Sequence, residues 1–576
     1  MWWIMQKQVI SEPLPTPGSP DRAGSGQALV RTLAYLRAEQ QANDHWAGVL
    51  SSSALATAIA IVALQQVDRT GYAERIAVGR RWLFATQLDD GGWGDGIIDE
   101  SNINATSLAI GALIFTQPAA PEPETMDRLR RARERLSAFG GWEAVGDPNR
   151  CTLSGPCRTI AALAGIMDWR RIKRLRPEVV LLPQGVRRTI STTFPAYLSI
   201  ATLHAEMVPH PLNALPSYER VKRLCIEWLA KTQGANGSFE ESAFLSSVII
   251  SCWTAAGYGD LPWLQPALRF VLESQRADGG WPIDRDLETF DTDLTTFAFM
   301  EAGEPVPNAE RVRDWLLARQ FDTVCFPTGA KPGGWAWAMP AGWPDADDSS
   351  YTVLALRALG VPAAHPALRR GASWLEGMQN RDGSWSTFVR NSRMPFDHDC
   401  PYITGHVLCA LHAAGRLRTK PRILERALAY LTEAQRYDGS FASIWFREAT
   451  AGTASVLEAL ADLDLLHTLM ATRARDYLLR AQNDDGGWAG LRMQASTAEE
   501  TAWAMLALLR CPSDERIRAS VARGVDWLVQ HQREDGTWAE WPLGLYYSAM
   551  WYSDSYYAVT LPARALARAR AAYGDK

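Results

Sequence analysis

The sequence predicts an all-α fold built from repeated helix pairs. Segments such as RALAYLTEAQ and GVDWLVQHQ place apolar residues at helical spacing. A short motif, Gln-x-x-x-Gly-x-Trp, recurs along the chain, and copies that start at 435, 482 and 532 are 47 and 50 residues apart. That period is typical of stacked helix-pair repeats. No succession of segments alternates apolar and polar residues, so we expect few strands.

The repeat motif favours a structural role over a catalytic one. Each copy places an Asp-Gly or Asn-Gly type turn after an amphipathic segment, which predicts the end of a helix. A Gln amide at a helix end can satisfy unpaired backbone groups and lie against the next indole. The clear copies start at Gln87, Gln275, Gln379, Gln482 and Gln532, and weaker copies that end in Phe start at Gln233 and Gln435.

An acidic cluster, Asp345-Ala346-Asp347-Asp348, precedes an apolar segment with helical spacing. We therefore expect the acids at a helix N-terminus, where Asp and Ser also serve as ordinary caps. Crowded carboxylates cannot all ionise, and a neighbouring apolar cavity would raise the pKa of one of them further. The cluster thus predicts a carboxylic acid that faces a space enclosed by aromatic rings. The nearby candidates are Trp335, Trp337 and Trp343.

The two motifs together resemble the paired signature of the class II terpene cyclases. The chain is similar to the squalene-hopene cyclase-like group over nearly its whole length, including FDTDLTTFAFMEAG at 290–303 and CPYITGHVLCAL at 400–411. The resemblance implies two (α/α) double-barrel domains with a cavity between them. Residues 46–305 would form an inserted barrel, and 26–45 with 306–576 the catalytic barrel. Residues 1–25, rich in Pro, Gly and Ser, are expected to be a flexible leader.

The resemblance also implies an intramolecular cyclase, an isomerase that protonates an alkene and so starts a carbocation cascade. Asp347 would donate the proton, while Asp345 and Asp348 would hold it and spread the charge left behind. His406 matches the family histidine that is expected to hydrogen-bond the first acid, Asp345. Without the resemblance, a His in an apolar helical segment is more often a satisfied core residue.

Aromatic rings would stabilise each cation through their π-faces, in a pocket that excludes water. The resemblance carries this role to positions spread along the chain, although core packing is the alternative at each. The expected substrate-binding residues are Trp337, Phe290, Phe388, Trp445, Phe194, Trp335, Trp551 and Tyr552.

Departures from the family pattern concern the substrate. The chain leaves little room for the long insertion that forms a membrane-inserted helix in triterpene-forming relatives, and REATAGT at 447–453 replaces an aromatic-rich motif. We expect a polyprenyl chain, either squalene-like or a prenylated aromatic meroterpenoid precursor. The alternative is a prenyl diphosphate, which would need Mg²⁺ and basic residues such as Arg390, Arg393 and Arg447. A remote alternative is a non-catalytic helical-repeat or prenyltransferase-like protein.

The composition of the chain limits the classes of molecule that it is expected to bind. A net charge of -5 without a basic stripe argues against nucleic acid, and eight scattered Cys without metal-ligand spacing predict reduced thiols in the cytoplasm and no metal site. No stretch approaches the roughly 20 apolar residues that span a bilayer. Because residues 217–228 suggest an ordinary amphipathic helix, we expect at most weak peripheral membrane contact. Protonation itself requires no cofactor, and we expect a monomer or homodimer that binds an isoprenoid small molecule.

Overall fold

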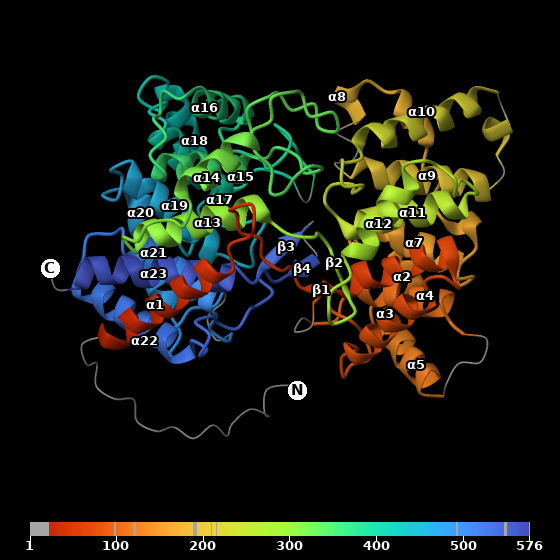
Figure 1. Cartoon of the computed structure of the whole chain (residues 1–576), viewed down its shortest axis with the longest axis horizontal. Coiled ribbons are helices and arrows are strands. Elements are labelled where there is room, and N and C mark those ends of the chain that lie inside the picture. The colour runs from red at the N-terminus through yellow and green to blue at the C-terminus, as the bar shows by residue number, and fades with distance from the viewer. Residues whose placement is uncertain are drawn as a thin grey trace.

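A computed structural model describes residues 22–96, 100–118, 123–187, 193–208, 210–214, 216–394, 397–490, 494–546 and 550–574. These residues form two helical lobes, each with an inner and an outer set of helices (Figure 1). The prediction of an all-α fold with two double barrels is confirmed. No helix in the described ranges is long and apolar enough to cross a membrane.

The C-terminal lobe contains a closed inner ring of six helices, in which each helix contacts the next and the last returns to the first. These helices are buried on nearly all sides, and most of their residues are apolar or small. The ring consists of α13 (Glu288–Glu301), α15 (Ala346–Ala358), α17 (Pro401–Ala413), α19 (Thr450–Asp462), α21 (Ala498–Leu508) and α23 (Tyr557–Tyr573).

Outer helices cover this ring and are buried on one face only. In α18, for example, only Ala427, Tyr430 and Leu431 are buried, and the remaining faces carry charges in solvent. α1 packs against α22, α23 and α13, although it comes first in the chain. The outer helices are α1 (Arg22–Ala38), α14 (Ala309–Ala318), α16 (Pro366–Met378), α18 (Pro421–Ala434), α20 (Leu469–Ala481) and α22 (Glu515–His531).

The second lobe has an inner ring of five helices, with further helices and turns outside it. The ring is α2 (Ala54–Asp68), α4 (Ile103–Phe115), α7 (Ser154–Leu163), α9 (Phe194–Met207) and α11 (Ala243–Ala255). The outer α-helices are α3 (Ala73–Ala85), α5 (Pro123–Ala138), α6 (Gly141–Val145), α8 (Gln184–Arg187), α10 (Pro216–Thr232) and α12 (Leu264–Glu273). Three 3₁₀ turns complete it: η1 (Trp169–Arg171), η2 (Pro177–Leu181) and η3 (Pro211–Ala214).

Two short antiparallel pairs of strands lie near the junction of the lobes (Figure 1). β1 (Ser52–Ser53) pairs with β2 (Trp281–Pro282), and β3 (Gly544–Tyr546) pairs with β4 (Met550–Tyr552). The second pair brings the C-terminal aromatic stretch toward the other lobe. Its backbone is tied there by the N–H of Trp551, which donates to Asp95 Oδ2 at 2.9 Å.

The repeat motif holds neighbouring helices together through buried hydrogen bonds. In the copy that starts at Gln379, the amide Nε2 donates to the carbonyls of Gly383 at 3.0 Å and Ile423 at 2.9 Å. The indole of Trp385 donates back to Leu375 O at 2.7 Å. Gly383 has φ 102°, and a Cβ there would collide with the Arg426 carbonyl.

The same pattern reveals a further copy that the sequence hides. Gln320 Nε2 donates to the carbonyls of Gly333 and Ala367, both at 2.8 Å, and Trp335 Nε1 donates to Leu316 O at 2.7 Å. A long insertion separates the Gln from its Gly, which is why the spacing conceals the repeat. Trp335 is fully buried by this packing and does not line the cavity, so its prediction as a substrate-binding residue is wrong.

The lobes divide earlier in the chain than the resemblance implies. α13 packs against α15 and α23, so this helix lies in the C-terminal lobe, whereas a boundary at 305 would assign it to the inserted barrel. The first described helix begins at Arg22, within the expected leader of residues 1–25. The rest of that leader lies outside the described residues.

Candidate active site

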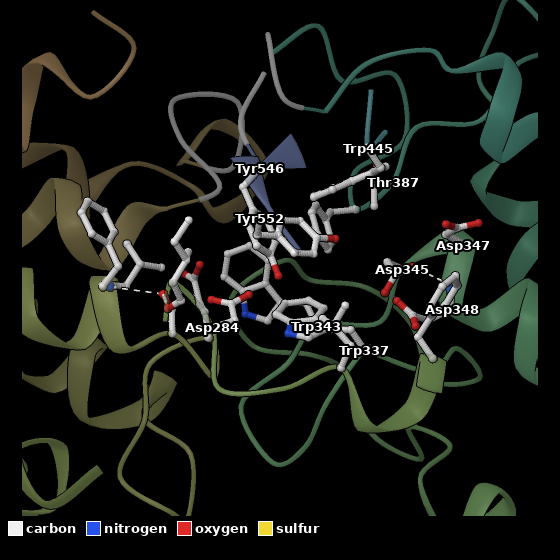
Figure 2. Close-up of a pocket in the computed structure, with 18 of the residues that line it drawn as sticks. Asp284, Trp337, Trp343, Asp345, Asp347, Asp348, Thr387, Trp445, Tyr546 and Tyr552 are labelled. Atoms are coloured by element: carbon white, nitrogen blue, oxygen red, sulfur yellow. Dashed lines mark hydrogen bonds between the residues drawn. The ribbon is translucent and has the colours of Figure 1, made fainter. Parts of the chain in front are cut away.

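A cavity is lined by residues of both lobes (Figure 2). Aromatic and aliphatic side chains make most of the wall, and carboxyl groups interrupt it at two places. The lining residues are Glu240, Ser242, Phe244, Leu245, Ile283, Asp284, Leu287, Phe290, Trp337, Trp343, Asp345, Asp347, Asp348, Thr387, Phe388, Trp445, Phe446, Tyr546, Tyr552 and Tyr557.

The acidic motif lies at the N-terminus of α15, where the sequence predicts it. Asp345 is the N-cap, and its Oδ1 accepts the backbone N–H of Asp348 at 2.8 Å. This cap directs the first helical turn, with Asp347 and Asp348, toward the cavity. All three carboxyl groups are buried, and Asp345 Oδ2 and Asp348 Oδ1 have no hydrogen-bond partner.

Burial changes the protonation of two of these acids. It raises the pKa of Asp345 well above its usual range and that of Asp348 to about 7, and the charge of Asp347 adds to both effects. The helix N-terminus favours the charged form of an acid in the same turn. Burial therefore favours the protonated forms of Asp345 and Asp348.

His406 lies on α17 and contacts the middle acid. Its Nδ1 is 2.7 Å from Asp347 Oδ1, and its Nε2 is 3.2 Å from the Tyr351 hydroxyl. The edge of the Tyr402 ring packs on the imidazole, with ring centroids 4.3 Å apart. The prediction that His406 bonds the first acid is wrong, because the Asp345 carboxyl is turned back onto its own helix as the cap.

A continuous series of aromatic contacts forms one wall of the cavity. Trp337 and Trp343 each lie 5.7 Å from Phe388, which lies 5.9 Å from Trp445, measured between ring centroids. The series continues from Trp445 to Tyr546 at 5.8 Å, and then to Tyr552 at 4.5 Å. Most of these rings meet edge to face, so their faces and edges alternate along the wall.

Five of the eight predicted aromatic positions line this cavity. They are Trp337, Phe290, Phe388, Trp445 and Tyr552. Besides Trp335, two others do not. Phe194 packs within its own lobe against Tyr197 and Trp228, at 5.9 and 5.0 Å. Trp551 does not line the cavity; the Arg447 guanidinium lies over its ring, 5.3 Å from the centroid.

Sequence reasoning missed several cavity residues, among them Phe244, Phe446, Tyr546, Tyr557, Glu240 and Asp284. For some of these residues, the position relative to the repeat motif is a signal that the sequence contains. Glu240 directly follows the repeat aromatic Phe239, and Asp284 and Phe388 each lie three residues after a repeat Trp, because these segments lead from the repeat turn into an inner helix.

The three arginines considered for a diphosphate do not line the cavity. Arg390 Nε donates to the Gln379 carbonyl at 2.7 Å, Arg393 is exposed, and Arg447 stacks on Trp551. In the part of the chain that the structure describes, no Lys or Arg lines the cavity. Within the same residues, no group of three or more His, Cys, Asp or Glu side chains could hold a metal ion.

Comparisons with known proteins agree with this architecture. Profiles of the squalene-hopene cyclase C-terminal and N-terminal domains match residues 288–571 and 29–197, and a prenyltransferase alpha-alpha toroid profile matches 183–329. A squalene–hopene cyclase from Alicyclobacillus acidocaldarius is 25% identical over 92% of this chain and 94% of its own length. One from Bradyrhizobium diazoefficiens is 35% identical over 44% of this chain and 43% of its own length.

A solved structure shares the fold over nearly the full length. The ent-copalyl diphosphate synthase from Streptomyces platensis aligns with a TM-score of 0.61 and 19% identity, covering 96% of this chain and 100% of that one. This likeness concerns the fold alone. With cyclase profiles matching both lobes and the acidic motif opening onto an aromatic cavity between them, the chain belongs to the squalene-hopene cyclase-like family of class II terpene cyclases.

Proposed function

We propose that this class II terpene cyclase protonates the terminal alkene of a linear polyprenyl chain through Asp347 and guides the resulting cation along the aromatic wall. The single observation that carries the proposal is the Asp347 carboxyl group, which opens onto the cavity while its Oδ1 is held 2.7 Å from His406 Nδ1. The reaction is an isomerisation, because a proton enters at one end of the chain and one leaves when the cascade ends.

The hydrogen bonds around Asp347 suit a strong acid. When His406 is an imidazolium, its Nδ1–H donates to Asp347 Oδ1 and its Nε2–H donates to the Tyr351 hydroxyl. The Asp347 proton then resides on Oδ2, from which it can pass to the alkene. The carboxylate that remains is stabilised by the imidazolium and by the N-terminus of α15. Burial favours the neutral forms of Asp345 and Asp348, which do not oppose this charge.

The aromatic wall supplies what a carbocation needs after the first step. Rings present negative π-faces to each tertiary cation, and an apolar cavity keeps out the water that would trap it. The rings of Phe290 and Tyr557, with centroids 5.8 Å apart, also belong to the cavity wall. Among the described lining residues, only the carboxyl groups could act as a charged base. The order in which the cation meets the aromatic side chains then controls how many rings form in the product.

A squalene-like chain or a prenylated aromatic meroterpenoid precursor fits this cavity better than a prenyl diphosphate. A diphosphate requires Arg or Lys, and the described lining offers none. The similarity to squalene–hopene cyclases supports an isoprenoid substrate. Protonation by Asp347 needs no cofactor, whereas Mg²⁺ would enter only with the diphosphate alternative.

Incubation of the purified enzyme with squalene, geranylgeranyl diphosphate and a geranylgeranylated hydroxybenzoate tests the proposal. Products would be identified by mass spectrometry and NMR. A cyclic isomer of an uncharged substrate, absent with Asp347→Asn, supports the proposal. Cyclisation of the diphosphate alone, in a reaction that depends on Mg²⁺, would replace it with the alternative.

We further propose that the enzyme works as a monomer or homodimer with at most weak peripheral membrane contact. α10 supports weak contact, because its apolar residues Tyr218, Val221 and Cys225 are buried and its charged residues, apart from the buried Lys222, face solvent. The exposed apolar side chains of this region are few. Leu181, Leu182 and Val186 are 55%, 38% and 46% exposed.

A further inference from the structure

Two further carboxyl groups, those of Glu240 and Asp284, line the cavity away from the acidic motif. Asp284 stands across the cavity from Asp345, Asp347 and Asp348, with Tyr546, Tyr552, Trp343 and Trp337 between them (Figure 2). Glu240 is close enough for the Asp284 charge to raise its pKa, in addition to the larger effect of its burial. The mechanism proposed above uses neither residue.

An unusual backbone conformation places Glu240 in the cavity. Glu240 and Glu241 both have left-handed backbones, with φ of 58° and 54°. Glu241 is fully occupied, since its carboxylate accepts the Ala341 N–H at 2.7 Å and the Asn236 amide at 2.9 Å. These bonds hold the turn and leave Glu240 on the cavity wall, where it is only 5% exposed and its Oε1 has no hydrogen-bond partner.

Asp284 is poised between its charged and neutral forms. Burial raises its pKa to about 7, while hydrogen bonds from the Ser242 and Tyr546 side chains act in the opposite direction. Burial likewise raises the pKa of Glu240 well above its usual range. This end of the cavity is therefore polar, with carboxyl groups that can donate as well as accept a hydrogen bond.

Three classes of substrate end meet this pair differently. A hydrocarbon end would leave Glu240 Oε1 buried and unpaired, which is unfavourable. A diphosphate would place more negative charge beside two acids, and no Lys or Arg lines the described cavity. An uncharged oxygen, as in an alcohol or phenol, could accept from one carboxyl group and donate to the other.

We propose that Glu240 and Asp284 form a head-group site that binds the hydroxyl oxygen of an alcohol or phenol at one end of the polyprenyl substrate. The inference rests on the proposed function in one respect, namely that the cavity holds a polyprenyl chain. Binding of the oxygen at this end directs the far end of the chain toward Asp347. The pair thus selects the substrate class and sets the direction in which the chain lies.

Ligand binding to the full chain tests the proposal without turnover. In an Asp347→Asn background, quenching of tryptophan fluorescence would give Kd values for geranylgeraniol, for the matching hydrocarbon without oxygen, and for geranylgeranyl diphosphate. Glu240→Leu should raise the Kd for geranylgeraniol about five- to tenfold, the effect of one lost hydrogen bond, and should lower the Kd for the hydrocarbon, which no longer buries an unpaired carboxyl group. Glu240→Gln, which keeps a donor and an acceptor, should retain most of the affinity.

The matched control is Glu433→Leu on the exposed side of α18, which should change no Kd. Circular dichroism would verify folding, and if Glu240→Leu fails to fold, Asp284→Leu carries the same test. The proposal is overturned if alcohol and hydrocarbon bind equally, if Glu240→Leu weakens both alike, or if the diphosphate binds most tightly. Failure of the proposed function is a separate result, since it requires that the enzyme with Asp347 intact yields no cyclic product from any substrate.

Discussion

The imidazole of His406 bridges the acid Asp347 and the hydroxyl of Tyr351, at 2.7 Å and 3.2 Å. These residues come from two adjacent inner helices, α15 and α17, so the geometry of the acid depends on how the helices pack. Tyr351 lies one turn after Asp347 on the same helix. The arrangement therefore fixes both nitrogens of the imidazole and leaves one carboxyl oxygen of Asp347 for the substrate.

Replacement of Asp347 by Asn should abolish cyclisation and leave the fold intact. The amide keeps the shape of the side chain but has no transferable acidic proton, and general acids commonly contribute up to about 10⁴-fold in rate. Product yield and circular dichroism would be measured together, with Asp127→Asn on the exposed face of α5 as the control. A folded Asp347→Asn enzyme that turns over at a near wild-type rate would exclude this residue as the proton donor.

His406→Ala should slow the reaction by about 10²-fold or more, because the conjugate base of Asp347 loses its cationic partner. Tyr351→Phe should have a smaller effect, since it removes only the bond to the far nitrogen. The dependence of kcat on pH distinguishes the two roles. If His406 acts through its charge, His406→Ala shifts the apparent pKa of the acid upward; an unchanged profile and rate would make it a core residue.

The sequence predicts the helical class, the repeats and the acidic helix start because each depends on local signals. Turn residues, caps and apolar periodicity act within about ten residues, and the motif at Asp345 illustrates this. Five aromatic positions were found by resemblance. Trp335 was misassigned because its repeat partner, Gln320, is separated from it by an insertion.

The features that the sequence does not predict are contacts between segments far apart in the chain. The partner of His406 depends on which carboxyl group caps α15, a choice between Asp345 and Asp347 that spacing does not reveal. Glu240 reaches the cavity through a left-handed turn that sequence patterns do not predict for Glu. Asp284 faces the acidic motif only because the two lobes meet around the cavity.

A matched pair of tryptophan variants separates scaffold from site. Trp335→Phe removes the bond to Leu316 O, which keeps the Arg319 N–H as its donor, so we expect a loss of about 0.5–1.5 kcal/mol in the free energy of unfolding, the net effect of one hydrogen bond. Trp337→Phe loses no such bond, because Trp337 Nε1 has no hydrogen-bond partner, but it changes the cavity wall. Thermal unfolding and product distribution would be measured for both. Equal stability losses, or a product change with Trp335→Phe alone, would contradict the assignment.

The free energy of unfolding should decrease as the pH rises from about 5 to 8. Several buried carboxyl groups have pKa values raised to about 7 or 8, so the folded state binds more protons than the unfolded state in this window. The stabilisation is present at low pH and lost as each group ionises in the fold. The groups are Asp284, Asp348, Asp397, Asp554, Glu499 and Glu500.

Thermal unfolding at constant ionic strength checks this prediction, and Asp397→Asn provides a specific test. Asp397 accepts the backbone N–H groups of Phe388 and Val389, both at 3.1 Å, and so positions one cavity ring. The variant should flatten part of the pH dependence, because one titrating group is lost. A Tm that rises steadily from pH 5 to 8 would mean that these acids are not held protonated in the fold.

Membrane contact should be weak and should depend on the exposed side chains Leu181, Leu182 and Val186. Three partly exposed aliphatic groups can contribute only about 3 kcal/mol on insertion into a bilayer surface. The charged face of α10 adds no apolar area, because its apolar residues pack inside the lobe.

Flotation with liposomes would compare the intact chain, a chain without residues 1–20, and a variant with Ser at all three positions. We expect little recovery with the intact chain and less with the Ser variant. Strong binding by the truncated chain that survives the Ser substitutions would reveal a membrane surface elsewhere and make squalene the leading substrate.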